Sequence, residues 1–259
     1  MLHALLVLIG SSGRVVFEKE WVKTIAGRAT LYGGLLTTIQ TLSKQSLAMH
    51  PSYIEYGQVA VTVVLDADYE KTSMVCALFH DIDDGPDFGR LIAKAILAGF
   101  LKEYPEFTAA ARKPSIQNQK FTNFANKLVD IISNATQSIL NQLKMKHKGL
   151  VSSLLLFDEG QQPVTSGKLD DHVGVVANLQ ALITFSDGIM SERQDVAQSI
   201  TLEMSEKIVF IHRIRNGRAS LVSICKKSIK KSIHLQYIEE TVTLLEKLFV
   251  LQSNLMADH

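Results

Sequence analysis

The segment LLVLIGSSGRVVFEKEW, from Leu5 to Trp21, joins an apolar run to an alternating run across a Gly-Ser-Ser-Gly break. The run from Leu5 to Ile9 predicts a strand that is buried on both faces, and Arg14 to Trp21 alternates as a half-exposed strand does. Glycine loops that bind phosphate open into a helix and carry further Gly or Lys-Ser/Thr positions, which this break lacks. The Gly10–Gly13 break therefore predicts the turn of a β-hairpin.

Composition limits the classes of protein that the chain can belong to. The 259 residues are 46% hydrophobic and carry a net charge of +1, which fits one large or two ordinary domains and gives no global attraction to nucleic acid or lipid. We interpret Cys76 and Cys225 as small buried hydrophobes outside any disulfide or metal cluster, in a reducing compartment. The first apolar run is too short for a signal peptide, and no uncharged stretch reaches the roughly 18 residues that span a bilayer. The expectation is a soluble, cytoplasmic protein.

The hairpin is followed by an order of elements that occurs twice. In the first half, helical spacing of Leu31, Leu35, Ile39 and Leu42 precedes three strands and a helix, and Gly33 and Gly34 indicate close packing against a sheet. The strands are expected near 52–58, 59–67 and 73–81, and the helix over 88–104 with Asp87 as its N-cap. The second half repeats this pattern with a hairpin over 151–169, a helix to 189, three strands and a helix over 234–251. Both halves are thus predicted to be β-β-α-β-β-β-α.

A long amphipathic helix is expected between the halves, from about Ser115 to Met145. Its apolar residues recur at steps of three and four, which predicts a buried stripe made of Phe121, Phe124, Leu128, Ile131, Ala135, Ile139 and Leu143. The predicted class is α+β, with two domains that each contain a five-stranded, mainly antiparallel sheet flanked by helices. We expect the domains over residues 1–113 and 149–259, with the helix in 114–148 belonging to the first domain or bridging both.

An acidic cluster ends the first half's last predicted strand. The sequence HDIDDGPD contains His80, Asp81, Asp83, Asp84 and Asp87, a set of oxygen and nitrogen donors that could hold a cation and serve a metal-dependent hydrolase. The spacing differs from that of an EF-hand loop, and the same residues suit a solvated turn before a helix N-terminus. We favour the turn and keep the hydrolase as an alternative.

A basic segment lies in the second half. Between His212 and Lys231 the chain has no acidic residue, and we propose partner or lipid contact for the cationic side chains Arg213, Arg215, Arg218, Lys226, Lys227, Lys230 and Lys231. Aromatic residues do not alternate with these cations, which disfavours binding to single-stranded nucleic acid. The other interpretation is a charged edge strand that prevents aggregation.

The element order and the opening MLHALLVLIGSSGRVVFEKEW resemble the longin domain and the small chains of adaptor complexes. The second half is similar also to roadblock domains, which place an additional helix before their first strand. The resemblance implies a non-enzymatic module without catalytic residues, metal or cofactor. Such domains are platforms for small Ras-like GTPases, nucleotide-exchange complexes and vesicle-trafficking coats, and they pair through sheet edges and helix faces.

For this chain the resemblance implies a tandem longin or roadblock scaffold. The expected partners are a small GTPase and a longin- or roadblock-type subunit, in a homo- or heterodimer, with peripheral contact to an anionic membrane and no nucleic acid. The expected contact surface is an exposed sheet edge or the first helix of each half. A coat or tether subunit that never contacts a GTPase is the remaining alternative.

Overall fold

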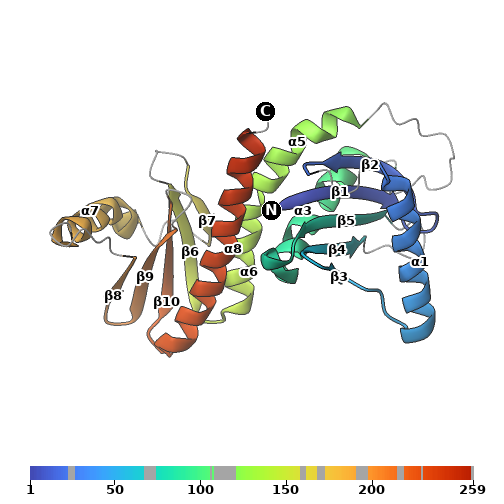
Figure 1. The fold of residues 1–259 in the computed structure, drawn as a ribbon. Helices are drawn as coiled ribbons and strands as arrows, with labels where there is room; N and C mark the ends of the chain where they lie inside the picture. The colour runs from blue at the N-terminus through green and yellow to red at the C-terminus, as the bar shows by residue number, and fades with distance from the viewer. Residues whose placement is uncertain are drawn as a thin grey trace. The chain divides into compact units, whose positions relative to one another are not determined.

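The computed structural model describes the chain except for residues 23–26, 67–73, 106, 108–120, 158–161, 168–172, 191–197, 215–218, 229 and 258–259. The chain divides into two compact units (Figure 1). The first unit consists of Met1–Ala135 with Leu251–His259, and the second of Thr136–Val250. None of the helices in the described ranges combines the length and the apolar character that crossing a membrane requires.

The first unit has the predicted strand and helix order. Its elements are β1 (Leu2–Ile9), β2 (Arg14–Glu20), α1 (Ala29–Leu47), β3 (Tyr53–Tyr56), β4 (Val59–Leu65), β5 (Met74–Asp81), a 3₁₀ turn (Ile82–Asp84), α3 (Gly85–Glu103) and α5 (Thr122–Ser133). The strands form one antiparallel sheet in the order β2-β1-β5-β4-β3. This arrangement confirms the α+β class for the first half.

The second unit repeats that order. Its elements are α6 (Ala135–Lys146), β6 (Leu150–Phe157), β7 (Val164–Ser166), α7 (Val173–Met190), β8 (Ser199–Glu203), β9 (Lys207–Ile214), β10 (Ala219–Lys226) and most of α8 (Lys231–Ala257). The antiparallel sheet has the order β7-β6-β10-β9-β8, which is the order of the first sheet counted from its own first strand. The predicted repeat of β-β-α-β-β-β-α is therefore confirmed.

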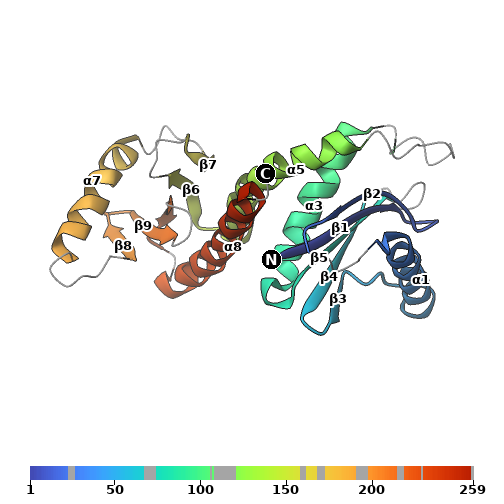
Figure 2. The same ribbon diagram turned by 45° about the horizontal axis from the view of Figure 1, so that its top comes forward.

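The first sheet is covered on both faces (Figure 2), as the apolar character of its first strand predicts. Successive side chains of a strand point to opposite faces. Ala4, Leu6 and Leu8 join the core beneath α1, whereas the equally buried Leu5 and Val7 point to the other face, where α3 packs against β4 and β5. This placement confirms that β1 is buried on both faces.

The Gly10–Gly13 break forms the turn between β1 and β2. The backbone N–H groups of Ser12 and Gly13 both donate to the carbonyl of Ile9, at 3.2 and 2.8 Å. Gly13 has a φ of +66°, which favours glycine, and a Cβ added to Gly33 of α1 would lie 2.4 Å from the Gly13 carbonyl oxygen. The hairpin prediction is confirmed, and the turn's glycine lets the helix approach it closely.

Helix α1 packs through Gly33 and Leu36 and not through Leu31, Leu35 or Leu42. The side that faces the sheet contains Ala29, Gly33, Leu36 and Gln40, all of which are buried. A Cβ added to Gly34 would meet nothing within 4 Å, so only the first of the two glycines has the predicted packing role.

The helix expected from Ser115 to Met145 is two helices over the part that the structure describes. α5 ends at Ser133 and α6 begins at Ala135, and the intervening Asn134 donates its backbone N–H to Asp130. The apolar stripe was correctly predicted as core, because its described members are buried except for the half-buried Ile131.

The second sheet has the same two-sided core, with α7 and α8 on opposite faces (Figure 1). Beneath α7, Leu179 of that helix shares a core cluster with Val209 and Ile211 of β9 and Val222 and Ile224 of β10. On α8, the predicted apolar residues Ile238, Val242, Leu245, Leu248 and Phe249 are all buried.

Candidate functional site

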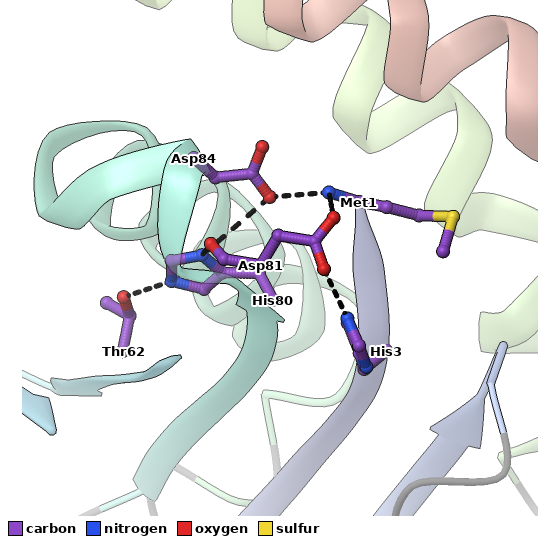
Figure 3. Close-up of polar contacts among 6 residues, drawn as sticks. All are labelled: Met1, His3, Thr62, His80, Asp81 and Asp84. Carbon is purple, nitrogen blue, oxygen red and sulfur yellow. Dashed lines mark hydrogen bonds and ion pairs between the residues drawn. The ribbon is translucent and has the colours of Figure 1, made fainter. Parts of the chain in front are cut away.

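The acidic turn follows β5 and begins α3, as Figure 3 shows. Asp81 is the last residue of β5, and Asp84 ends the 3₁₀ turn directly before the helix. The interpretation of this sequence as a turn before a helix N-terminus is confirmed. Asp87 is not the N-cap, because the helix begins two residues earlier, at Gly85, and places Asp87 in its first turn.

His80 is the fully buried member of this turn. Its Nδ1 lies 2.9 Å from the Asp81 carbonyl oxygen and its Nε2 lies 2.8 Å from Thr62 Oγ1. Because the carbonyl can only accept, Nδ1 carries the proton and the Thr62 hydroxyl donates to Nε2. Burial lowers the pKa of His80, although the bond to Asp81 and the charge of Asp84 act in the opposite direction. The residue is therefore a neutral, hydrogen-bonded core histidine.

The ring of His80 is enclosed by α3 on its helix side. A Cβ added to Gly89 would lie 2.4 Å from His80 Nε2 and 2.2 Å from Thr62 Oγ1. The glycine leaves the space that the imidazole fills, so no room remains next to Nε2 for a metal ion or substrate.

The two carboxylates nearest His80 already contact cationic or hydrogen-bonding groups of this unit (Figure 3). The amino group of Met1 lies 2.7 Å from both Asp81 Oδ2 and Asp84 Oδ2, and His3 Nε2 lies 2.6 Å from Asp81 Oδ1. Partial burial acts to raise the pKa of Asp81, but the hydrogen bonds from Met1 and His3 outweigh it and hold that pKa below its usual value.

This geometry gives no support to the metal-dependent hydrolase. Asp83 and Asp87 are exposed, and the ligand atoms of the cluster from His80 to Asp87 do not converge. Within the described ranges, the only three His, Cys, Asp or Glu side chains whose ligand atoms converge are in the second unit.

The basic segment is divided between two ends of the second sheet. Arg213 is half-buried near the end of β9, whereas the exposed Lys226 ends β10, whose eight residues extend about 23 Å. Lys227, Lys230 and Lys231 follow Lys226 and are also exposed. Arg215 and Arg218 lie outside the described residues. The edge-strand interpretation is wrong, because β9 and β10 are interior strands of the sheet.

Two of the four lysines contact an acidic or a carbonyl group. Lys231 Nζ lies 3.7 Å from the Glu203 carboxylate, and Lys227 Nζ donates to the Met204 carbonyl at 3.3 Å. An exposed ion pair of this kind contributes at most about 1 kcal/mol to stability. The lysines thus remain available for contact with an anionic surface.

Exposed apolar side chains gather on α1, the first helix of the first unit. Leu31, Leu35 and Leu42 are 66%, 44% and 56% exposed. At 100° per residue these three positions lie within about 40° of one another, opposite the side that packs on the sheet. We call Leu31, Leu35 and Leu42 the leucine row. Helix α7, which has the same place in the second unit, exposes Phe185 and Ile189 at 68% and 61%.

The sequence did not indicate one further cluster, formed by His147, Cys225 and His234. The first histidine and the cysteine are 78 positions apart, so no linear spacing connects them. The sequence feature that could have indicated this cluster is the pair of Cys225, near the end of a predicted strand, and His234, nine residues later. The prediction that Cys225 is buried is confirmed, but its neighbours were missed.

Comparisons with known proteins find likeness only among solved structures. MglB from Myxococcus xanthus is 13% identical with a TM-score of 0.40, and the match covers 44% of this chain and 94% of that chain. A roadblock/LC7 domain from Streptomyces avermitilis is 14% identical with a TM-score of 0.39, covering 44% and 97%. MglB from Thermus thermophilus is 11% identical with a TM-score of 0.37, covering 44% and 87%. No protein-family model and no curated protein sequence matches the chain. At this level of similarity, function has to be inferred from the residues of this chain.

Proposed function

We propose that this chain is a non-enzymatic scaffold that binds a small Ras-like GTPase through the leucine row of α1. The platform in this proposal consists of two longin- or roadblock-like domains, residues 1–113 and 149–259, joined through 114–148. Its expected setting is the cytoplasmic surface of a trafficking membrane, as part of an exchange or tethering complex.

The observation that carries this proposal is the exposure of the leucine row. A surface helix of a globular protein turns its apolar stripe toward the core and its polar side toward water. Helix α1 instead has an apolar row on each side, because Gly33 and Leu36 pack on the sheet while the leucine row faces outward. Large apolar side chains exposed along one side of a helix support an interaction site there.

The leucine row would supply part of the binding energy, and the rest must come from other contacts, because association itself costs at least about 4 kcal/mol. Burial of a leucine side chain contributes about 1.5–3 kcal/mol, so covering the exposed parts of three leucines is worth on the order of 3 kcal/mol. That amount corresponds to a factor of about 100 in affinity. Residues at i, i+4 and i+11 of one helix face also form a pattern of anchors that a groove can accept.

The lysines after β10 supply a second contact in this proposal. Lys226, Lys227, Lys230 and Lys231 would meet anionic headgroups or an acidic partner surface, each worth about 1 kcal/mol near a charged membrane. Arg213, near the end of β9, would form a separate contact, and the sequence adds Arg215 and Arg218 as candidates for it. Sedimentation with phosphatidylserine vesicles tests the lysines, and charge reversal at Lys226 and Lys230 should remove any binding.

A pull-down of the full chain against Ras-like GTPases, in the GDP and GTP states, tests the main proposal. Leu42→Glu should reduce capture about tenfold or more, because it places a charge in the apolar contact. The matched control is Thr41→Glu, which adds the same charge at the neighbouring exposed position, about 100° away around the helix.

The proposal is wrong if no GTPase binds in either nucleotide state, or if the two variants behave alike. Capture of a longin- or roadblock-type subunit without any GTPase, and sensitive to Leu42→Glu, would favour the coat or tether alternative. That result would retain the leucine row as the interface and change the partner.

A further inference from the structure

A buried cluster in the second unit joins two imidazoles and a thiol. His147 follows the end of α6, Cys225 lies near the end of β10, and His234 is in the first turn of α8. Their ligand atoms all lie within 4.8 Å of one another, and the three side chains are 3%, 2% and 1% exposed. The consecutive elements β10 and α8, together with the distant α6, thus bring transition-metal ligands to one point of the core.

The contacts within the cluster are short. His234 Nδ1 lies 2.6 Å from His147 Nε2 and 3.1 Å from Cys225 Sγ. Tetrahedral zinc, with bonds of about 2.0 Å to nitrogen and about 2.3 Å to sulfur, holds neighbouring ligand atoms about 3.3–3.6 Å apart. Small rotations of the side chains would therefore open the cluster to the size of a metal site.

A metal-free cluster leaves its polar groups poorly paired. The backbone N–H of Gly149 donates to His147 Nδ1 at 3.1 Å, so the proton of a neutral His147 lies on Nε2 and points at His234 Nδ1. Cys225 Sγ lies 3.1 Å from the same Nδ1 atom, so a thiol hydrogen on this contact would need the same lone pair. One lone pair cannot satisfy two donors, whereas a cation at this point would accept electron pairs from all three side chains.

Ser223 holds His234 in the orientation that a metal ligand needs. Its Oγ lies 3.1 Å from His234 Nε2 and can accept the proton of that nitrogen, which leaves Nδ1 free to coordinate. A histidine that binds a metal through one ring nitrogen commonly donates a hydrogen bond from the N–H of the other. When His147 coordinates through Nε2, its proton moves to Nδ1, where the hydrogen bond from Gly149 is lost and one to the carbonyl of His147 itself replaces it.

We propose that His147 Nε2, Cys225 Sγ and His234 Nδ1 bind one Zn²⁺ ion that clips α6, β10 and α8 together. Two imidazoles and a thiolate are the nitrogen and sulfur donors that zinc prefers, and water would complete the tetrahedron. Three protein ligands plus water is the ligand count of catalytic zinc sites, but the near-complete burial of all three residues excludes substrate and favours a structural ion. The rings of Phe210 and Tyr237, centred 4.2 Å from His234 and 5.2 Å from His147, limit the space around the site.

Metal binding also changes the chemistry of the cysteine. Burial raises the pKa of the Cys225 thiol to about 12, so the metal-free protein keeps it protonated. A bound cation ionises a coordinating thiol and releases its proton. Zinc uptake by this site should therefore release a proton, which a pH indicator in weak buffer detects.

The first experiment measures metal stoichiometry in the full chain. Metal-free protein is titrated with Zn²⁺ against a chromophoric chelator and separately with Co²⁺, whose thiolate charge-transfer absorption reports a Co–S bond. We expect one equivalent of either ion and a higher melting temperature with zinc. A folded chain that binds neither ion overturns the proposal, and uptake of copper without zinc overturns the assignment of the metal.

Variants identify the ligands. Cys225→Ser should abolish the charge-transfer band and stoichiometric zinc binding, with folding verified by circular dichroism. Cys76→Ser is the matched control, because Cys76 is equally buried in β5 of the first unit and should leave the band unchanged.

Ser223→Ala provides a test that does not remove a ligand. It should weaken zinc binding about 10–100-fold through the orientation of His234. Unchanged zinc affinity in Cys225→Ser, or loss of the band in folded Cys76→Ser, contradicts the assigned ligands.

Discussion

The two units share one topology but differ in the buried polar residues at the connection from the last strand to the following helix. In the first unit the histidine is on the strand, where His80 fills the space left by Gly89 and bonds to Thr62. In the second unit it is on the helix, where His234 meets Ser223 and Cys225 of the strand. The same architecture thus encloses a single satisfied imidazole in one unit and a set of metal ligands in the other.

The difference shows which part of the fold is free to vary. The sheets require only that strand residues facing a helix are apolar, and in the central strands, which are covered on both faces, this applies to nearly every position. The strand-to-helix connection is the place where a polar group enters the core, and each such group needs its own partners. The first unit supplies a hydroxyl and a carbonyl, whereas the second supplies another imidazole and a thiol.

The largest expected effect is acid destabilisation through the second unit. Burial, together with the neighbouring His147, lowers the pKa of His234 to about 4. A histidine with a lowered pKa binds fewer protons in the folded than in the unfolded state, so stability is complete above about pH 6.5 and falls toward pH 4. At about 1.4 kcal/mol per pH unit, His234 alone accounts for roughly 3 kcal/mol. Burial also lowers the pKa of His147 and of His80, so both residues add to the loss of stability as the pH falls.

Chemical denaturation of metal-free protein between pH 7 and pH 4 measures this loss. His234→Gln should remove the contribution of the second unit, while His80→Gln should retain it. Zinc should protect the wild-type protein against mild acid, since a coordinated imidazole resists protonation. An identical pH slope in wild type and His234→Gln would show that this imidazole is not buried as described.

A smaller effect is expected where α1 meets the first hairpin. Gly33→Ala places a methyl group against the Gly13 carbonyl oxygen and should destabilise the protein by about 1–3 kcal/mol, the usual range for overpacking. Gly34→Ala, one residue later, meets open space and should stabilise the helix by up to about 1 kcal/mol. Thermal unfolding of the two variants measures the difference. Equal effects of the two substitutions would mean that α1 does not approach the turn on its Gly33 side.

The smallest effect is expected at the acidic turn. Asp81→Asn combined with Asp83→Asn should lower stability by less than about 1 kcal/mol, because Asp83 is exposed, Asp81 is only partly buried and ion pairs of this kind are weak. Mg²⁺ and Ca²⁺ should leave the melting temperature of both proteins unchanged. Stabilisation of the wild type by either ion, lost in the double variant, would restore the metal-dependent hydrolase as a candidate.

Periodicity in the sequence was sufficient to predict the fold. The apolar run from Leu5 to Ile9, the glycine turn after it and the repeated order of strands and helices all follow from local patterns, because alternation and helical spacing reflect which side chains leave water. The solvated turn around Asp83 was predictable for the same reason. Only local boundaries differed, as at Asn134, where one expected helix is two.

The tertiary structure decided what the side chains do together. The leucine row shows helical spacing in the sequence, but only the close approach of Gly33 to Gly13 determined that the row faces outward. The cluster of His147, Cys225 and His234 depends on the pairing of β10 with its neighbours and the packing of α8, which brings together residues up to 87 positions apart. Local sequence patterns indicate which side chains of a segment are buried and which are exposed. Contacts between distant segments depend instead on strand register and on the packing of the whole unit.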